Sequence, residues 1–202
     1  SGYFREPHNW RRMLFDFPPL KLPNIAFRNR GDLTFEDAGK RWGFELGDDI
    51  SHGMALGDLD NDGDLDVVIN RLGSPAAVLR NDAAAPRVAV RLRGAAPNTA
   101  GIGSRVSVFA GDSLPRQSRE VIAGGLYLSS SDPLLTFATG RAEHVRIEVD
   151  WRDGRRSVID SALPGREYEI AEGTTGSPES RIPNPKSLFE DVTSQLGGHQ
   201  HV

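Results

Sequence analysis

The stretch Gly57-Asp58-Leu59-Asp60-Asn61-Asp62-Gly63-Asp64-Leu65-Asp66 places five carboxylates at alternating positions around one glycine. Carboxylates this close repel one another, so a compact loop needs protons or a hard cation to neutralise them. Bound Ca²⁺ does this more readily near neutral pH. Side-chain oxygens of Asp58, Asp60, Asp62 and Asp66, the carbonyl of Asp64 and a water approach the roughly 6–8 oxygens that calcium prefers. We therefore expect a calcium site, turned at Gly63, that is formed by Asp58, Asp60, Asp62, Asp64 and Asp66.

The first half of this loop has the spacing of an EF-hand, but Ile69 occupies the twelfth position, where an EF-hand requires a bidentate Glu. The flanking runs 51–56 and 65–70 resemble short β-strands and lack a 3.6-residue period. The sequence thus predicts a calcium loop that joins two strands. The alternative is a solvated acidic turn without metal, yet ordinary turns do not need so many Asp residues.

The composition is that of an ordinary globular protein. The chain has 202 residues, of which 38% are hydrophobic and 26% charged, enough for one or two domains. A formal net charge of −4 argues against a nucleic-acid-binding protein. No apolar run approaches the roughly 20 residues that a membrane-spanning helix needs, so no direct membrane span is expected. Cysteine is absent, which excludes disulfides and thiolate metal sites.

An internal repeat indicates a modular, all-β chain. The run 35–38, Phe-Glu-Asp-Ala, recurs at 189–192 as Phe-Glu-Asp-Val, each followed by a glycine at the same distance. In the first copy, Phe27-Arg28-Asn29 begins eight residues before Phe35, which predicts a hairpin turning at 30–32. In the second, the matching run at 79–81 begins 110 residues before Phe189. We therefore expect an insertion at the tip of the second hairpin, where a long loop costs little extra entropy.

The insertion carries its own strand pattern. The runs 87–92, 105–109, 144–151 and 156–159 alternate between apolar and polar residues, which predicts one wet and one buried face. We expect an independent β-sandwich or a small barrel. The predicted organisation is an N-terminal extended segment (1–22), a first repeat region (23–85), the inserted β domain (86–172), a Gly/Ser/Pro-rich linker (173–187) and the start of a next repeat (188–202).

Two family resemblances accompany these patterns. Residues 53–81 resemble FG-GAP/VCBS-type propeller repeats through the match at Gly57–Asp66. The insertion resembles the ASPIC/UnbV domain, as found in cartilage acidic protein-like proteins, through the runs 101–106, 119–121, 125–133 and 145–151. The resemblance implies an all-β fold made of a partial β-propeller with a calcium loop and an inserted β domain. It also implies an extracytoplasmic location, whether periplasmic, cell-surface or secreted, and brings no catalytic or cofactor-binding residues.

A propeller typically needs about 4–8 blades, whereas this chain supplies roughly one and a half. We therefore expect a protein partner, or the remainder of a larger propeller polypeptide, to complete it, and a glycan is a further candidate ligand. The expected function is a non-enzymatic, calcium-stabilised binding or structural module. The alternative is an accessory subunit of an extracytoplasmic enzyme or of an electron-transfer complex, and the sequence leaves both open.

Overall fold

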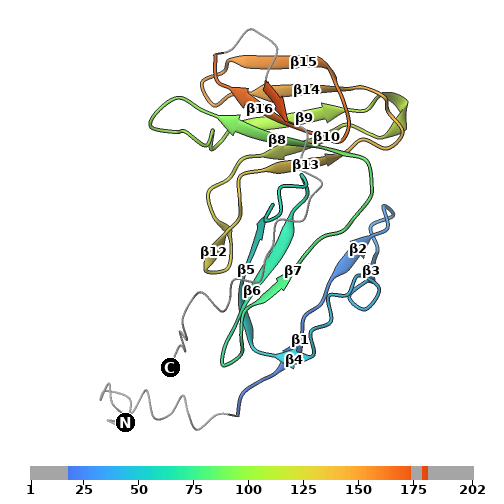
Figure 1. The fold of residues 1–202 in the computed structure, drawn as a ribbon, viewed down its shortest axis with the longest axis vertical. Coiled ribbons are helices and arrows are strands. Elements are labelled where there is room, and N and C mark those ends of the chain that lie inside the picture. Colours follow the sequence, from blue (N-terminus) through green and yellow to red (C-terminus); the bar gives the residue numbers. More distant parts are fainter. Residues whose placement is uncertain (1–17, 174–178, 182–202) are drawn as a thin grey trace. The chain divides into compact units, whose positions relative to one another are not determined.

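The computed structural model describes residues 18–173 and 179–181. Regular structure in these residues is almost entirely β, apart from one short 3₁₀ turn, η2 (Gly111–Ser113). Several small sheets form, and none of those described closes on itself. These features confirm the predicted all-β class (Figure 1). Contacts divide the described residues into two compact units, one of residues 18–53 and 69–79 and the other of residues 54–68, 80–173 and 179–181.

The first unit contains the predicted hairpin. Strand β2 (Phe27–Asn29) pairs antiparallel with β3 (Phe35–Asp37). The Arg30 N–H donates to the Thr34 carbonyl at 3.0 Å across the turn, and Gly31 has the positive φ, +84°, that favours glycine. Nearby, β1 (Leu22–Pro23) pairs antiparallel with β4 (Asp48–Asp49).

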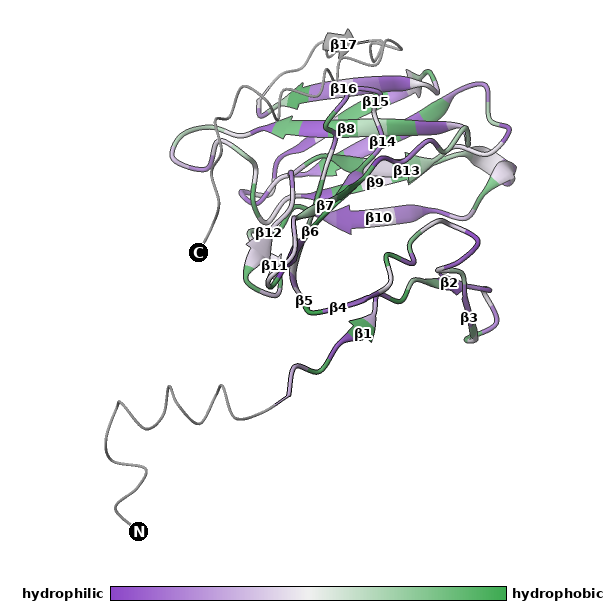
Figure 2. Ribbon diagram, turned by 60° about the horizontal axis from the view of Figure 1, so that its bottom comes forward, coloured by the Kyte–Doolittle hydropathy of each residue, from purple (hydrophilic) through white to green (hydrophobic). Residues whose placement is uncertain are grey.

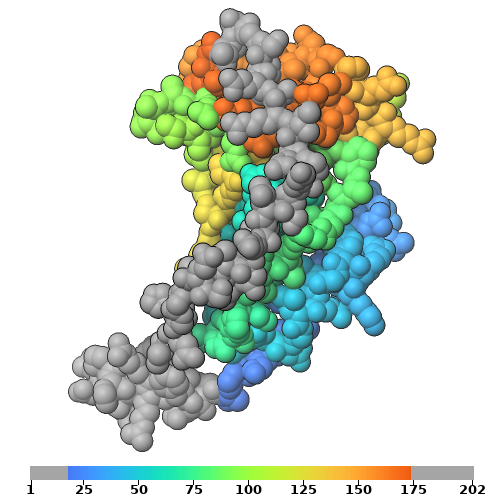
Figure 3. Space-filling view, viewed as in Figure 1, coloured from blue at the N-terminus to red at the C-terminus, as the bar shows by residue number. Residues whose placement is uncertain are grey.

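Most large apolar side chains of residues 18–50 are exposed to solvent. Figure 3 shows this stretch coloured blue to light blue. The only apolar side chain in it that is buried is that of Ala38. The exposed large side chains are those of Leu20, Leu22, Ile25, Phe27, Leu33, Phe35 and Trp42. This region therefore has an apolar surface but almost no core of its own.

A three-stranded sheet carries the acidic loop. Its strands are β5 (Ser51–Gly57), β6 (Asp66–Arg71) and β7 (Ala77–Leu79), hydrogen-bonded in that order. The β-branched run Val67-Val68-Ile69 favours the extended backbone of β6. The strands predicted on both sides of the loop are thus confirmed.

The inserted region forms two four-stranded sheets, as expected for a sandwich. The order of the first is β10 (Gln117–Glu120), β9 (Arg105–Phe109), β14 (Val145–Asp150) and β15 (Arg156–Ala162). The order of the second is β13 (Leu135–Ala138), β8 (Arg87–Arg93), β16 (Arg166–Ala171) and β17 (Glu179–Arg181). A small hairpin, β11 (Gly125–Leu126) with β12 (Ser129–Ser130), precedes β13.

Alternate residues of these strands build one hydrophobic core. Val88 and Val90 of β8 and Ile147 and Val149 of β14 have no exposed surface, and Trp151 is almost fully buried beside them. Figure 2 shows the matching alternation of hydrophobic and hydrophilic residues along the sandwich strands. The predicted alternating runs are therefore strands, as expected, and their apolar face is the buried one.

Strand β16 was not predicted from the sequence. It pairs parallel with β8, with Arg166 opposite Val88 and Ala171 opposite Arg93. Strand β17 then returns antiparallel along β16, with Arg181 opposite Glu167. The parallel pair joins segments about 80 residues apart, and no local pattern of residues specifies such a pairing.

Several predicted segments lie outside the described residues. These are most of the N-terminal segment, most of the linker, and the start of a next repeat with the predicted pairing partner at Phe189. Within the described part of the chain, no helix has the length and apolar character needed to cross a membrane.

Candidate metal centre

The acidic loop begins where β5 ends at Gly57 and closes where β6 begins at Asp66. Gly63 adopts a φ of +83°, as its predicted turn requires, and Asn61 adopts a φ of +59°. Both residues turn the chain tightly, and Asn tolerates the left-handed region better than most residues. The loop thereby folds back on itself and brings side chains from its two ends together.

Three of the predicted carboxylates converge. One oxygen each from Asp58, Asp60 and Asp66 lies within 4.8 Å of the others. Asp60 is 8% exposed, and its Oδ1 is buried without a hydrogen-bond partner among the described residues. Burying a carboxylate oxygen without a partner is costly unless a cation or a proton compensates it. The arrangement fits a hard cation, because every donor that it offers is an oxygen.

Backbone donors hold the outer two carboxylates of this group. The N–H groups of Asp62 and Gly63 donate to the two oxygens of Asp58 at 3.1 and 3.0 Å. Asp66 is 1% exposed and accepts from the N–H of Leu59 at 2.9 Å and of Asn81 at 2.8 Å. Backbone hydrogen bonds therefore orient Asp58 and Asp66, whereas Oδ1 of Asp60 has no hydrogen-bond partner among the described residues.

The pKa shifts also indicate that negative charge is costly in this loop. Burial raises the pKa of Asp58 and of Asp60, and the neighbouring charges of Asp62 and Asp66 raise that of Asp60 further. Burial also raises the pKa of Asp64, to about 7, although the charge of Arg87 opposes the shift. Negative charge in the loop is thus unfavourable without a counter-charge, and a divalent cation would relieve this cost.

The other two predicted ligands lie beside the convergent group and not in it. Asp62 accepts the Asp64 N–H at Oδ1, at 2.9 Å. Asp64 is 3% exposed, and its Oδ2 lies 2.8 Å from Nη2 of Arg87. This is an ion-pair distance, but neither oxygen of Asp64 has a hydrogen bond of good geometry within the described structure. The charge of Arg87 is therefore the main compensation for this buried carboxylate.

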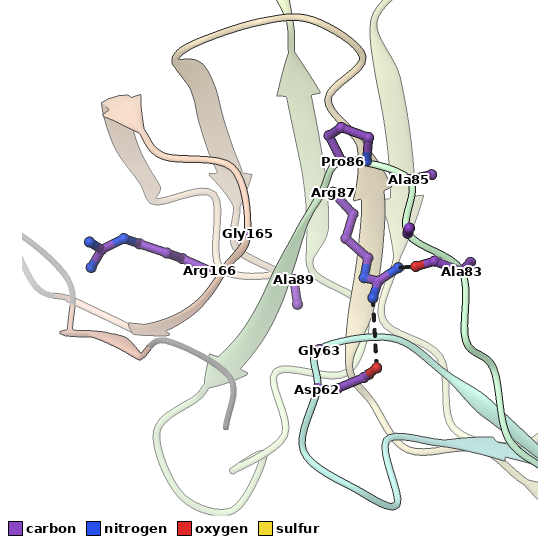
Figure 4. A pocket seen from close by; sticks show the side chains of 10 residues that line it. Asp62, Gly63, Ala83, Ala85, Pro86, Arg87, Ala89, Gly165 and Arg166 are labelled. Atoms are coloured by element: carbon purple, nitrogen blue, oxygen red, sulfur yellow. Dashed lines mark hydrogen bonds and ion pairs between the residues drawn. The ribbon is translucent and has the colours of Figure 1, made fainter. Parts of the chain in front are cut away.

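Sequence reasoning did not identify Arg87 and Asn81 as neighbours of the loop. Arg87 also donates from Nη1 to the Ala83 carbonyl at 2.5 Å and lies 3.8 Å from Oδ2 of Asp62. Figure 4 shows its guanidinium between the segment at Ala83 and the loop at Asp62, at the side of a cavity of about 210 Å³. No local motif marks either residue, because each lies more than ten positions from the ligand that it contacts.

Comparisons with known proteins agree with this architecture. Residues 23–69 match the family model of the FG-GAP-like repeat, and residues 94–177 match the model of ASPIC and UnbV. These matches confirm the predicted combination of a propeller-type repeat with an ASPIC/UnbV domain, neither of which is a typical enzyme domain. A search of curated proteins gave no match.

Proposed function

We propose that this chain, which joins an FG-GAP-like repeat to an ASPIC/UnbV domain, is a non-enzymatic, calcium-stabilised binding or structural module of an exported protein. The observation that carries the proposal is the buried, unpartnered Oδ1 of Asp60 where Asp58 and Asp66 converge. Asp58, Asp60 and Asp66 would hold the ion, and Asp62 and the Asp64 carbonyl are close enough in sequence to complete its oxygen shell. Bound calcium supplies charge neutralisation and rigidity here, not chemistry.

The proposed role in recognition or assembly rests on the open surface of the first unit. Phe27, Phe35 and Trp42 are each more than half exposed. Exposed aromatic side chains grouped in one short segment are typical of surfaces that bind another protein or stack on a sugar ring. We propose that this segment receives either a protein partner or the neighbouring blade of a longer propeller, with a glycan as the other candidate.

The polar residues that a hydrolase would use have structural contacts instead. In the serine-rich run 129–132, the Ser129 Oγ donates to the Met54 carbonyl, and the Ser131 Oγ accepts the Leu56 N–H. Asp132 forms an ion pair with Arg91. His144 contacts the exposed Ser161 through Nδ1 at 2.8 Å. These contacts favour a binding or structural role over catalysis.

Calcium binding is tested by titration calorimetry and by thermal unfolding of the full chain in calcium, in magnesium and in a chelator. We expect calcium to raise the free energy of unfolding by about 2.7 kcal/mol when free calcium is a hundred times Kd. The variant Asp60→Asn removes the negative charge of this side chain with little change of shape, and it should lose most of this gain.

The matched control is Asp112→Asn, which removes an exposed carboxylate on η2 and should retain the full calcium response. Circular dichroism of both variants establishes that they fold. A wild-type melting curve that is the same in calcium and in chelator, with no heat of binding, would show that the loop is an acidic turn without metal.

A further inference from the structure

The two faces of β8 differ in what they contact. Val88, Val90 and Leu92 point into the sandwich core and are buried. The opposite face carries Arg87, Ala89, Arg91 and Arg93, the positions for which the sequence predicts a wet face. Yet Ala89 on this face is only 2% exposed, so the prediction is wrong for its middle. Other parts of the protein therefore cover the middle of the outward face of β8, while Arg93 at its end stays exposed.

At the start of β8 the neighbour is the acidic loop. Arg87 pairs with Asp64 at 2.8 Å, and their side chains are 22% and 4% exposed. The second amino group of Arg87 is held by the Ala83 carbonyl, which fixes the direction of the guanidinium. Gly63 of the loop and Ala89 of β8 also line the same cavity. The loop and the first half of β8 are therefore in direct contact within one compact unit.

Further along β8, Arg91 contacts the strand that leads into the loop through one intermediate. Its guanidinium binds both oxygens of Asp132, at 2.6 and 3.0 Å. The backbone N–H of Asp132 donates in turn to the carbonyl of Leu56, at 2.8 Å, one residue before the loop begins. Bidentate arginine–carboxylate pairs are strong and directional. Both ends of the loop are thus connected to arginines on the same face of β8.

We propose that the outward face of β8 positions the calcium loop, and that Asp64 serves this purpose and is not a side-chain ligand of the ion. Arg87 holds the Asp64 carboxylate, and Arg91 holds the preceding strand through Asp132. The Asp64 backbone carbonyl stays available to the ion while its side chain faces the sandwich. The part of this inference that concerns calcium rests on the proposed function, whereas the Arg87–Asp64 ion pair does not.

The charge distribution supports this division of roles. The convergent group contains Asp58, Asp60 and Asp66 but not Asp64, although all of them belong to the same loop. Arg87 lies at ion-pair distance from Asp64, although neither Asp64 oxygen has a hydrogen bond of good geometry, whereas no cationic side chain of the described residues lies at ion-pair distance from Asp60. Calcium affinity then depends on residues outside the loop, as it does at metal sites whose outer contacts orient the ligands.

A double-mutant cycle on the full chain tests the proposal, with Asp64→Asn, Arg87→Gln and the combination of the two. Arg93→Gln is the matched control, because Arg93 lies on the same face of β8 but pairs with Glu169 while 64% of its side chain is exposed. Calcium affinity is measured by titration calorimetry. The melting temperature is measured in chelator, where calcium plays no part.

In chelator, Arg87→Gln should lower the melting temperature by roughly 5 °C, because it leaves a buried carboxylate unpaired. The double variant should recover part of that loss. Each single variant should weaken calcium binding on the order of tenfold, as expected for an outer contact, and the double variant should weaken it no further. Arg93→Gln should match the wild type in both measurements.

If the two losses of calcium affinity multiply in the double variant, Asp64 is an independent ligand and the proposal fails. It also fails if the double variant in chelator is no more stable than Arg87→Gln. A wild-type chain that binds no calcium would instead refute the proposed function, and the cycle in chelator would still test the ion pair. The two failures are therefore distinguishable.

Discussion

The β2–β3 hairpin and the sandwich each have a sheet face that carries apolar side chains, but only the face in the sandwich is buried. In the sandwich, Ile147 and Val149 are fully buried. In the hairpin, Phe27 and Phe35 lie on one face, because Phe27 opposes Asp37 and Asn29 opposes Phe35 in the pairing, and they remain 59% and 63% exposed. Apolar side chains on one face of a sheet are thus not by themselves evidence that the face is buried.

The physical reason for the difference is the number of layers. A sheet buries one face only against a second layer, and the sandwich supplies both layers from its own strands. A two-stranded hairpin has no second layer and is marginally stable alone. The hairpin is therefore the region whose stability and solubility depend most on what binds to it.

Truncation of one apolar side chain in each region should separate the two regions most strongly. Ile147→Ala should lower the free energy of unfolding by about 2–5 kcal/mol, because it leaves a cavity in a closed core. Phe35→Ala should change it by about 0.5 kcal/mol or less, since most of this ring is already in water. Urea unfolding followed by circular dichroism measures both. Equal losses would mean that a covered face of the hairpin has been mistaken for an open one.

Self-association, unlike the free energy of unfolding, should depend on the exposed side chains of the hairpin. Exposed apolar faces and free strand edges promote association, so we expect the chain to self-associate as its concentration rises. The double variant Phe27→Ser/Phe35→Ser should shift it towards monomer in sedimentation velocity. Tyr127→Ser, which removes an aromatic ring of similar exposure (67%) from the β11–β12 turn, is the control and should have little effect. A wild-type chain that stays monomeric at the highest concentration reached contradicts this expectation.

The smallest expected effect is at the tip of the hairpin. Leu33 is 97% exposed and adopts a φ of +66°, in a region that glycine tolerates and leucine does not. Leu33→Gly should therefore stabilise the hairpin by about 1 kcal/mol, seen as slower hydrogen exchange of the Arg30 amide, which donates to Thr34 across the turn. The same change at Leu72, an exposed leucine whose φ is not positive, should not stabilise. Faster exchange in Leu33→Gly would show that leucine is accommodated without strain.

Local pattern predicted much of the fold. The turn at Gly31 and the strands on both sides of the acidic loop follow from residues that lie within a few positions of one another. The parallel pairing of β16 with β8 did not follow, since Arg166 and Val88 meet only when the sandwich closes. Strands β10 and β13 were also missed, because each is four residues long and so carries little alternation.

Local sequence likewise predicted some features of the candidate metal site and not others. The spacing of the aspartates was enough to predict Asp58, Asp60 and Asp66 as neighbours, because a loop of ten residues can bring them together by itself. It did not show that Asp62 and Asp64 lie beside Arg87, which is 3.8 and 2.8 Å from their carboxylates. One clue was present in the sequence: arginine occupies three of the four outward positions of β8. That regularity indicates a face with a partner, but it does not say which partner.

Because β17 returns along β16, the two ends of the inserted domain lie close together. The chain enters the sandwich at Arg87 and leaves β17 at Arg181, next to Glu167, at the same end of the sheet. With one strand between them, these two points lie about 10 Å apart. A domain whose ends are this close can be inserted into a surface turn of another protein without distorting the backbone of that protein. A graft of residues 87–181 would carry the buried core, and the host would have to replace the contacts that Arg87 makes with Asp64 and that Asp132 makes with Leu56.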